Sequence, residues 1–439
     1  MKKLLLLSVT ASAVLMAGGN VVQVETTPTV PTAETLETLG WDFSGQSVIF
    51  YQSGDRGAEK DLFGQKGSLA DFGLQLKAVN KDIFAGIGAG VEVSGLSSLN
   101  LENWMVSNTM QGVGEMGDVD SATDGAWISQ MYLTYGLGNT TLKLGRQELP
   151  KALSPFAFSE GWNVFKNTFD AAVVINKDFS DTTLVGAWVS GGNHNGMPAI
   201  RKDASNNPYT FNNMSDFNSL NNSNGIYMLS AQNKSIDGLT LTGTYYYAPT
   251  LVGNNDAHIL WGDAKFKVGD YNVAAQLGTI MSGGFTNNTF AWGVKVGADF
   301  DIFDASIAYS SVDNGDRGVN NFGGVKTPLY TQMILNQDAI KTNNMTFVAR
   351  VGTKALGGRF DLAYGYSGIM DDSDRGCLVD GRVHGAGAYS ELDLTYKTKI
   401  LNDDTTLFAG YIFQSRSYAE KKQSGWSDNI LRFWVRYNF

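Results

Sequence analysis

Hydrophobic and polar residues alternate strictly at the C-terminal end of the chain, over residues 429–439. Successive side chains of a β-strand point to opposite faces, so this period of two predicts a strand with one apolar face. The other face carries Arg432 and Arg436. In water the apolar face would need a second protein layer, whereas in a bilayer lipid covers it and the charged face meets a wet lumen. The apolar face consists of Leu431, Phe433, Val435, Tyr437 and Phe439.

The same alternation recurs from Trp41 to the end of the chain. It is clearest over residues 290–300, where every even position is apolar and the odd positions include Lys295 and Asp299. The chain holds roughly eighteen such segments of about ten residues, the length that a tilted strand needs to cross a bilayer. The weakest are residues 182–190 and 226–232, where apolar and polar residues mix on both faces.

The connections between these segments are short and long in turn. Long loops are expected at residues 97–125, 191–224, 314–344 and 370–387, with short turns between them. This regular alternation is typical of outer-membrane barrels with short periplasmic turns and long extracellular loops. A β-sandwich would not alternate loop lengths so regularly, and a propeller would show a repeat of blade length. The short turns are expected at residues 80–82, 136–139, 177–181, 235–238, 268–270, 301–304, 354–358 and 400–404.

The pattern therefore predicts an all-β fold, a closed antiparallel transmembrane β-barrel of about eighteen strands. The strand number must be even, because antiparallel strands cross the membrane in alternating directions and both ends of the barrel lie on the same side. We expect the barrel domain to span residues 41–439, with residues 20–40 as a periplasmic leader.

The N-terminal residues 1–19 have the pattern of a secretory signal peptide, with Lys2 and Lys3 before an apolar stretch that ends at Met16. Cleavage after residues 11–13 or after residues 17–19 fits equally well. No run reaches the ~18 apolar residues that a membrane-spanning helix needs.

Composition narrows the function classes. The net charge of −10 and the lack of a basic run argue against nucleic acid as a partner. The single Cys377 excludes an internal disulfide and a cysteine-based zinc site. The three histidines have no metal-binding spacing, so we expect no enzyme activity, no metal centre and no cofactor. Acidic loop residues near Asp118 and Asp371 could bind calcium on the surface, but their spacing matches no defined calcium loop and favours solvated acidic loops.

Charged residues fall on the inward face of many predicted strands. Opposite charges across a narrow pore create a transverse field that favours small polar solutes. Because both signs are present, ion selectivity stays open. The constriction candidates are Arg146, Lys143, Glu160, Lys265, Lys295, Asp299, Arg350, Arg432 and Arg436. The other inward charges are Lys77, Lys267, Arg359, Asp71, Glu92, Asp170, Asp263, Asp361, Glu391 and Asp393.

Two motifs resemble a known family. Gly145-Arg146-Gln147, a loop, and then residues 167–171 opening the next strand are similar to a pattern of OprD-type porins and epsilonproteobacterial major porins. The C-terminal Phe439, with Tyr437, resembles the assembly signal of outer-membrane barrels. The resemblance covers nearly all of residues 41–439, but only these two motifs are specific.

The resemblance implies an outer-membrane diffusion channel, often trimeric, in which the loop 149–165 folds inward and narrows the pore. It implies contact with outer-membrane lipid and lipopolysaccharide, and recognition by the barrel-assembly machinery. The loop departs from the arginine-rich acidic version of the carboxylate-selective members, because residues 159–162 around Glu160 stand in its place. A carboxylate preference therefore does not carry over.

Strict alternation would place the charged side chain of Arg146 in lipid, because Leu142 and Leu144 on the same face are expected to meet lipid. A bulge at Gly145 would turn Arg146 inward. The alternative is an arginine that reaches outward to lipopolysaccharide phosphates. For the whole chain we expect passive diffusion of small hydrophilic solutes, the alternative being a surface receptor or adhesin with a filled lumen.

Overall fold

The computed structural model describes residues 40–57, 60–107, 109–111, 124–193, 224–369, 377–379, 382–384, 387–401, 403–418 and 424–439. The predicted signal peptide, nearly all of the predicted leader and the acidic residues near Asp118 and Asp371 lie outside these ranges. In the described part, no helix is long and apolar enough to cross a membrane.

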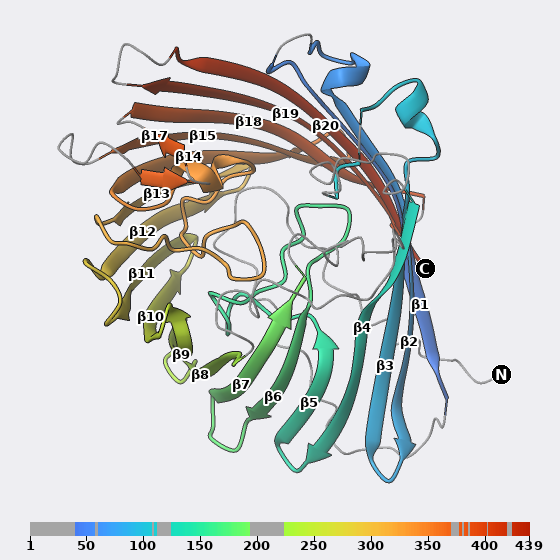
Figure 1. Ribbon diagram of the computed structural model, residues 1–439. Helices are drawn as coiled ribbons and strands as arrows, with labels where there is room; N and C mark the ends of the chain where they lie inside the picture. Colours follow the sequence, from blue (N-terminus) through green and yellow to red (C-terminus); the bar gives the residue numbers. More distant parts are fainter. Residues whose placement is uncertain are drawn as a thin grey trace.

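Eighteen strands form one sheet in which each strand pairs antiparallel with its neighbours. The sheet closes into a barrel where β1 pairs with β20 (Figure 1). A separate pair, β16 (Cys377–Val379) and β17 (Arg382–His384), lies in the connection between β15 and β18. The barrel strands are β1 (Asp42–Gly54), β2 (Ser68–Phe84), β3 (Ile87–Ser97), β4 (Asp124–Leu137), β5 (Thr140–Gln147), β6 (Phe169–Asn176), β7 (Thr182–Gly192), β8 (Ile226–Asn233), β9 (Leu239–Val252), β10 (Asn255–Val268), β11 (Tyr271–Ser282), β12 (Thr289–Phe300), β13 (Phe303–Val312), β14 (Asn344–Ala355), β15 (Gly358–Ile369), β18 (Gly387–Ile400), β19 (Thr405–Tyr418) and β20 (Trp426–Asn438).

The chain ends seal the barrel. The backbone N–H of Gly45 donates to the carbonyl of Phe439 at 2.8 Å, and the N–H of Phe439 donates back to Gly45 at 3.0 Å. A Cβ on Gly45 would lie 2.6 Å from the Phe439 ring, so glycine lets the terminal aromatic pack on β1. The predicted closing strand is confirmed as β20.

The alternating pattern separates an outward face from an inward face, as predicted. Along β12 the even residues, such as Phe290 and Val294, are exposed on the outside, while Ala291 and Lys295 on the odd face are buried inside. The outward apolar face is the one that a bilayer covers, and the lumen covers the other.

One predicted turn is misplaced. Residues 80–82 lie inside β2, which continues to Phe84, and the chain turns at Ala85 and Gly86, both with positive φ. The pairing of β2 with β3 is irregular between Asn80 and Phe84. The side chain of Asn80 accepts a hydrogen bond from the backbone N–H of Asp82, which imitates a turn without reversing the chain.

The two segments with the weakest alternation are strands as predicted, β7 and β8. Their inward side chains Val185, Val189, Ile226 and Met228 are apolar and buried against material inside the barrel. Because both faces are apolar, the contrast between them is blurred in the sequence.

Three short 3-10 helices complete the described elements. They are η1 (Gln65–Gly67), η2 (Leu101–Asn103) and η5 (Asn336–Ala339).

Candidate functional site

Two loops fold into the lumen and fill its middle (Figure 1). Loop A, residues 148–168, joins β5 to β6, and loop B, residues 313–343, joins β13 to β14. The inward course of loop A was predicted. That of loop B was not, because its sequence reads as an ordinary long outer loop.

The first half of loop A packs on the wall formed by β6 to β12. The ring of Phe156 contacts Tyr246 at 5.8 Å and Trp261 at 5.3 Å, both edge to face. The backbone N–H of Phe156 donates to the Tyr246 hydroxyl at 3.1 Å. The Ser154 hydroxyl bonds the same Tyr246 hydroxyl at 3.2 Å, so apolar burial and two buried hydrogen bonds hold this half against the wall.

The second half of loop A packs on the opposite wall. Phe165 lies edge to face with Trp127 of β4 at 6.1 Å. Trp162 and Phe165 share a buried cluster with Phe50 of β1 and Trp434 of β20. In a closed ring of eighteen strands, β1 and β20 lie across from β9 and β10, so loop A spans the lumen.

Glu160 joins the two loops. Its carboxylate, in a residue that is 4% exposed, accepts hydrogen bonds from the backbone N–H groups of Val325 at 3.1 Å and Lys326 at 2.8 Å. It also accepts from the Asn321 amide at 2.8 Å and the Trp162 indole at 2.9 Å. Three of these four donors belong to loop B, so one carboxylate joins the two loops through three hydrogen bonds.

Lys326 lies beside this carboxylate and donates from Nζ to the carbonyls of Met333 at 3.1 Å and Ile334 at 3.4 Å. Burial lowers the pKa of Lys326 to about 8, and the charge of Glu160 opposes that shift.

Loop B is fixed to the wall by charged side chains. Glu391 of β18 accepts from the N–H of Leu335 at 2.9 Å, and Arg350 of β14 donates to the carbonyl of Gln332 at 2.7 Å. Met333 packs on the inner face of β14 and β15 in a cluster with Val348 and Ala363.

Three arginines predicted to line the constriction support the structure instead. Arg350 binds loop B as described, and Arg436 donates to the carbonyl of Val164 in loop A at 2.9 Å. Arg432 donates to the Gln52 amide oxygen on β1 at 2.8 Å. Parity placed all three inside the barrel correctly, but it could not show that loop carbonyls would bind Arg350 and Arg436 and that a neighbouring strand would bind Arg432.

The other predicted candidates lie at different places on the wall. Lys265 forms an ion pair with Asp263 at 3.3 Å, and Lys295 is buried. Asp299 is exposed near the short turn after β12. Lys143 places its ammonium 3.8 Å from the ring centre of Tyr132.

Arg146 lies on the outer face, so the predicted inward turn at Gly145 is wrong. Gly145 has a φ of +122°, yet the pairing of β4 with β5 continues without a shift and sets Arg146 opposite Met131, which is 59% exposed. Its guanidinium bonds Asp170 at 3.1 Å and the carbonyl of Ile128 at 2.9 Å. Asp170, predicted to face inward, neutralises the arginine on the outside.

Several charged groups of the lumen wall keep partial exposure. Lys77 pairs with Glu92 at 3.8 Å, and Lys166 with Glu148 at 2.6 Å. Lys166 and Glu148 were missed because they lie at the ends of loop A, where a strand pattern carries no information.

Arg359 and Lys397 lie side by side on β15 and β18. Arg359 pairs with Asp304 and Asp361, each at 2.7 Å. Among the described residues, neither Lys143 nor Lys397 has a carboxylate oxygen within 4.0 Å. Neither of these two lysines therefore forms an ion pair with a described residue.

In the part of the chain that the structure describes, no group of three His, Cys, Asp or Glu side chains lies close enough together to hold a metal ion.

No family model matches the sequence, and no curated protein matches it. The structure, however, resembles solved structures of Pseudomonas aeruginosa proteins. OccD3 (OpdP) shares 13% identity over 91% of both chains, with a TM-score of 0.66. The fold is that of the outer-membrane porins.

Two further structures agree with this assignment. OpdK of P. aeruginosa, solved with vanillate, shares 14% identity over 91% of this chain and 98% of its own, with a TM-score of 0.67. OccK8 (OprE) of the same organism shares 15% identity over 91% and 98%, with a TM-score of 0.64. The resemblance concerns the fold, and the surface-receptor alternative finds no support in it.

Proposed function

We propose that this protein is a porin of the Gram-negative outer membrane, through which small hydrophilic solutes and ions diffuse passively. One observation carries the proposal: two loops cross the lumen of a closed eighteen-stranded barrel and are joined at Glu160. A barrel of this size without inward loops would hold a wide aqueous channel, so loops A and B set its width. The protein catalyses no reaction, and it lowers a permeation barrier.

We propose a preference for anions as the finer property of the channel. Lys143 and Lys397 supply positive charge to the lumen wall and form no ion pair among the described residues. Charged rings along a narrow pore raise the local concentration of ions of opposite sign. The structure of OpdK with vanillate, a carboxylate, is consistent with an anionic solute in a barrel of this fold.

The test is single-channel recording of the refolded full chain in a planar bilayer under a salt gradient. We expect stable conductance steps and a reversal potential on the anion side. A folded, heat-modifiable barrel without conductance would overturn the channel, and a cation-selective reversal potential would overturn the anion preference alone.

We further propose the remaining features of the mature protein. Residues 1–19 are removed as a signal peptide and residues 20–40 form a periplasmic leader. Tyr437 and Phe439 act as a signal to the barrel-assembly machinery, supported by the position of Phe439 at the closing seam. The mature protein contacts lipopolysaccharide and assembles as a homotrimer.

A further inference from the structure

The loop between β3 and β4 sends a short segment into the lumen. Beyond η2, the backbone N–H of Ser107 donates to the carbonyl of Ser68 at the start of β2, at 2.8 Å. Residues 109–111, the next described part of this loop, are buried. Met110 belongs to the same apolar cluster as Phe165 of loop A. This segment is therefore a third piece of chain inside the barrel, beside loops A and B.

Asp71 of β2 anchors the segment to the wall. Its carboxyl group, in a residue that is 2% exposed, accepts hydrogen bonds through Oδ2 from the backbone N–H groups of Met110 at 2.8 Å and Gln111 at 3.1 Å. A buried N–H group without an acceptor is costly, and here one side chain satisfies two of them. Parity predicted that Asp71 faces inward, and the segment is what it binds there.

Gln111 binds the segment to loop A. Its side-chain amide accepts from the N–H of Phe165 at 3.0 Å and donates to the carbonyl of Phe165 at 3.3 Å. Asn163 of loop A donates from Nδ2 to the carbonyl of Met110 at 3.4 Å. Bonds to both backbone groups of one residue imitate the pairing of a neighbouring strand, so Gln111 fixes the backbone of loop A at Phe165.

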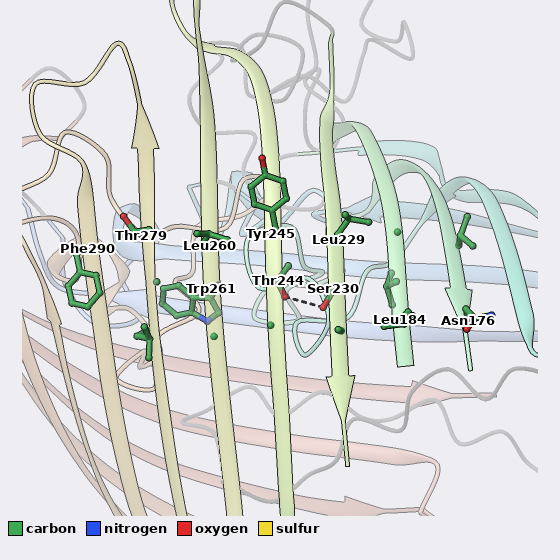
Figure 2. A pocket seen from close by; sticks show the side chains of 18 residues that line it. Asn176, Leu184, Leu229, Ser230, Thr244, Tyr245, Leu260, Trp261, Thr279 and Phe290 are labelled. Carbon is green, nitrogen blue, oxygen red and sulfur yellow. Dashed lines mark hydrogen bonds between the residues drawn. The ribbon is translucent and has the colours of Figure 1, made fainter. Parts of the chain in front are cut away.

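The first half of loop A is held by a different wall. Phe156 packs on Trp261 of β10 at 5.3 Å. Figure 2 shows Trp261 in this wall, whose outer face carries a groove, next to the Ser230 and Thr244 hydroxyls that bond each other at 3.0 Å. Release of residues 109–111 should therefore free the second half of loop A and leave the first half in place.

We propose that residues 109–111 act as a latch that positions the second half of loop A, with Asp71 and Gln111 as its positioning residues. The inference rests on the proposed function, because it names what holds one of the two loops that set the channel width. Through this latch the loop between β3 and β4 acts on the channel.

The test follows release of the latch and the channel current in the same protein. The reporter is Met110→Cys, because Met110 is 9% exposed and a thiol there reacts with a polyethylene-glycol maleimide only when the segment leaves its site. The single native cysteine is removed with Cys377→Ser. In this background Asp71→Leu removes the acceptor of both N–H groups, whereas Asp71→Asn keeps an amide oxygen in its place.

The matched control is Gln75→Leu. Gln75 is buried on the same inward face of β2 as Asp71, and its amide donates to Ser94 at 2.8 Å and to Glu92 at 3.3 Å, both on β3. This variant therefore replaces a buried polar side chain of the wall by leucine and leaves the bonds of the latch in place.

We expect Asp71→Leu to be labelled roughly tenfold faster than the reporter protein, because two buried hydrogen bonds no longer oppose release. Its single-channel conductance should be larger and noisier. Asp71→Asn should restore slow labelling and the quieter channel, since its amide oxygen still accepts. Gln75→Leu should label as slowly as the reporter protein.

Equal labelling rates in Asp71→Leu and Gln75→Leu would overturn the latch, and so would fast labelling with an unchanged channel. If Asp71→Leu forms no heat-modifiable barrel, Gln111→Ala replaces it, because this variant removes both bonds to Phe165 and keeps Asp71. A channel like that of the wild type in Gln111→Ala would also refute the proposal. If the reporter protein conducts no current, the proposed channel fails, whereas the labelling rates still decide whether Asp71 holds the latch.

Discussion

At the scale of single residues, Glu160 of loop A accepts three hydrogen bonds from backbone and amide donors of loop B and a fourth from the Trp162 indole of its own loop. A buried carboxylate with this many donors is stable, but its removal leaves several N–H groups without acceptors. Each such group costs ~1–3 kcal/mol, so a single substitution acts on the whole contact.

We expect Glu160→Ala to separate the loops and to increase both single-channel conductance and its fluctuations. Recording in planar bilayers measures this directly. The matched control is Glu148→Gln, in the same loop, because Glu148 is partly exposed and pairs with Lys166 outside this contact. Indistinguishable channels from wild type and Glu160→Ala would show that the contact does not set the pore width.

Lys326 gives the contact a dependence on pH. Burial lowers its pKa to about 8 from the ordinary 10.5, so between these values the docked loop binds fewer protons than an undocked one. Docking therefore gains stability as the pH rises from 8 towards 10.5, and the full penalty of the buried charge is present below pH 8.

We accordingly expect loop-dependent closures and current noise to decrease between pH 7 and roughly pH 10 in the wild type. Other lysines and tyrosines titrate in the same range, so the informative quantity is the difference from Lys326→Met. That variant should lose the part of the pH dependence that Lys326 causes. The same pH profile in both proteins would exclude Lys326 as the titrating group.

At the scale of elements, the barrel wall is shaped to receive the loops. A Cβ on Gly73 of β2 would lie 2.6 Å from the ring of Phe165 and 2.9 Å from Val164. Both residues belong to the end of loop A that packs on β1, β4 and β20. The glycine thus makes room for a loop rather than for a turn.

We expect Gly73→Val to displace the end of loop A while the barrel still forms, since valine suits a strand. Conductance should rise, and proteolysis within residues 148–168 should become faster. Gly136→Val is the control, because a Cβ on Gly136 meets nothing within 4 Å. Faster proteolysis in both variants would point to a general loosening of the wall.

The elements were predictable from sequence to the extent that each strand has an apolar face towards lipid and a polar face towards the lumen. That condition holds for β12 and β20, whose alternation is complete, and it fails for β7 and β8, whose inner faces are apolar because they pack on loop A. It also fails for Arg146, because an ion pair with Asp170 satisfies the arginine on the outer face. Strand periodicity contains no information on which neighbour neutralises a charge.

The course of loop B was beyond sequence reasoning for a related reason. Its contacts are made by backbone groups, such as the N–H groups of Val325 and Leu335, which every sequence possesses. The charges that receive them, Glu160 and Glu391, lie far away in the chain. Parity located Glu391 inside the barrel, but it could not distinguish a side chain that binds a loop from one that faces the pore.

At the scale of the whole molecule, selectivity depends on the charges that remain after the loops have been fixed. Arg350, Arg436 and Glu391 are bound to loop backbone, and Arg359 is neutralised by two aspartates. The sequence as a whole carries a net charge of −10. Net charge is therefore a poor guide to the pore. A hydrogen bond to a carbonyl leaves the charge of an arginine in place, and Lys143 and Lys397 add further positive charge without an ion pair among the described residues.

We expect Lys143→Gln/Lys397→Gln to shift the reversal potential towards zero or to the cation side. The physical reason is that the ion pairs of Lys77, Lys166 and Arg359 contribute little net field once these two charges are gone.

The control is Lys399→Gln, which removes one charge of the same kind from an exposed lysine beside the turn after β18. Because ions screen exposed charges over about 10 Å at 0.1 M salt, the shift should be larger at lower salt. A shift in Lys399→Gln as large as half that of the double variant would place the selective field at the channel mouth instead of along the wall of β5 and β18.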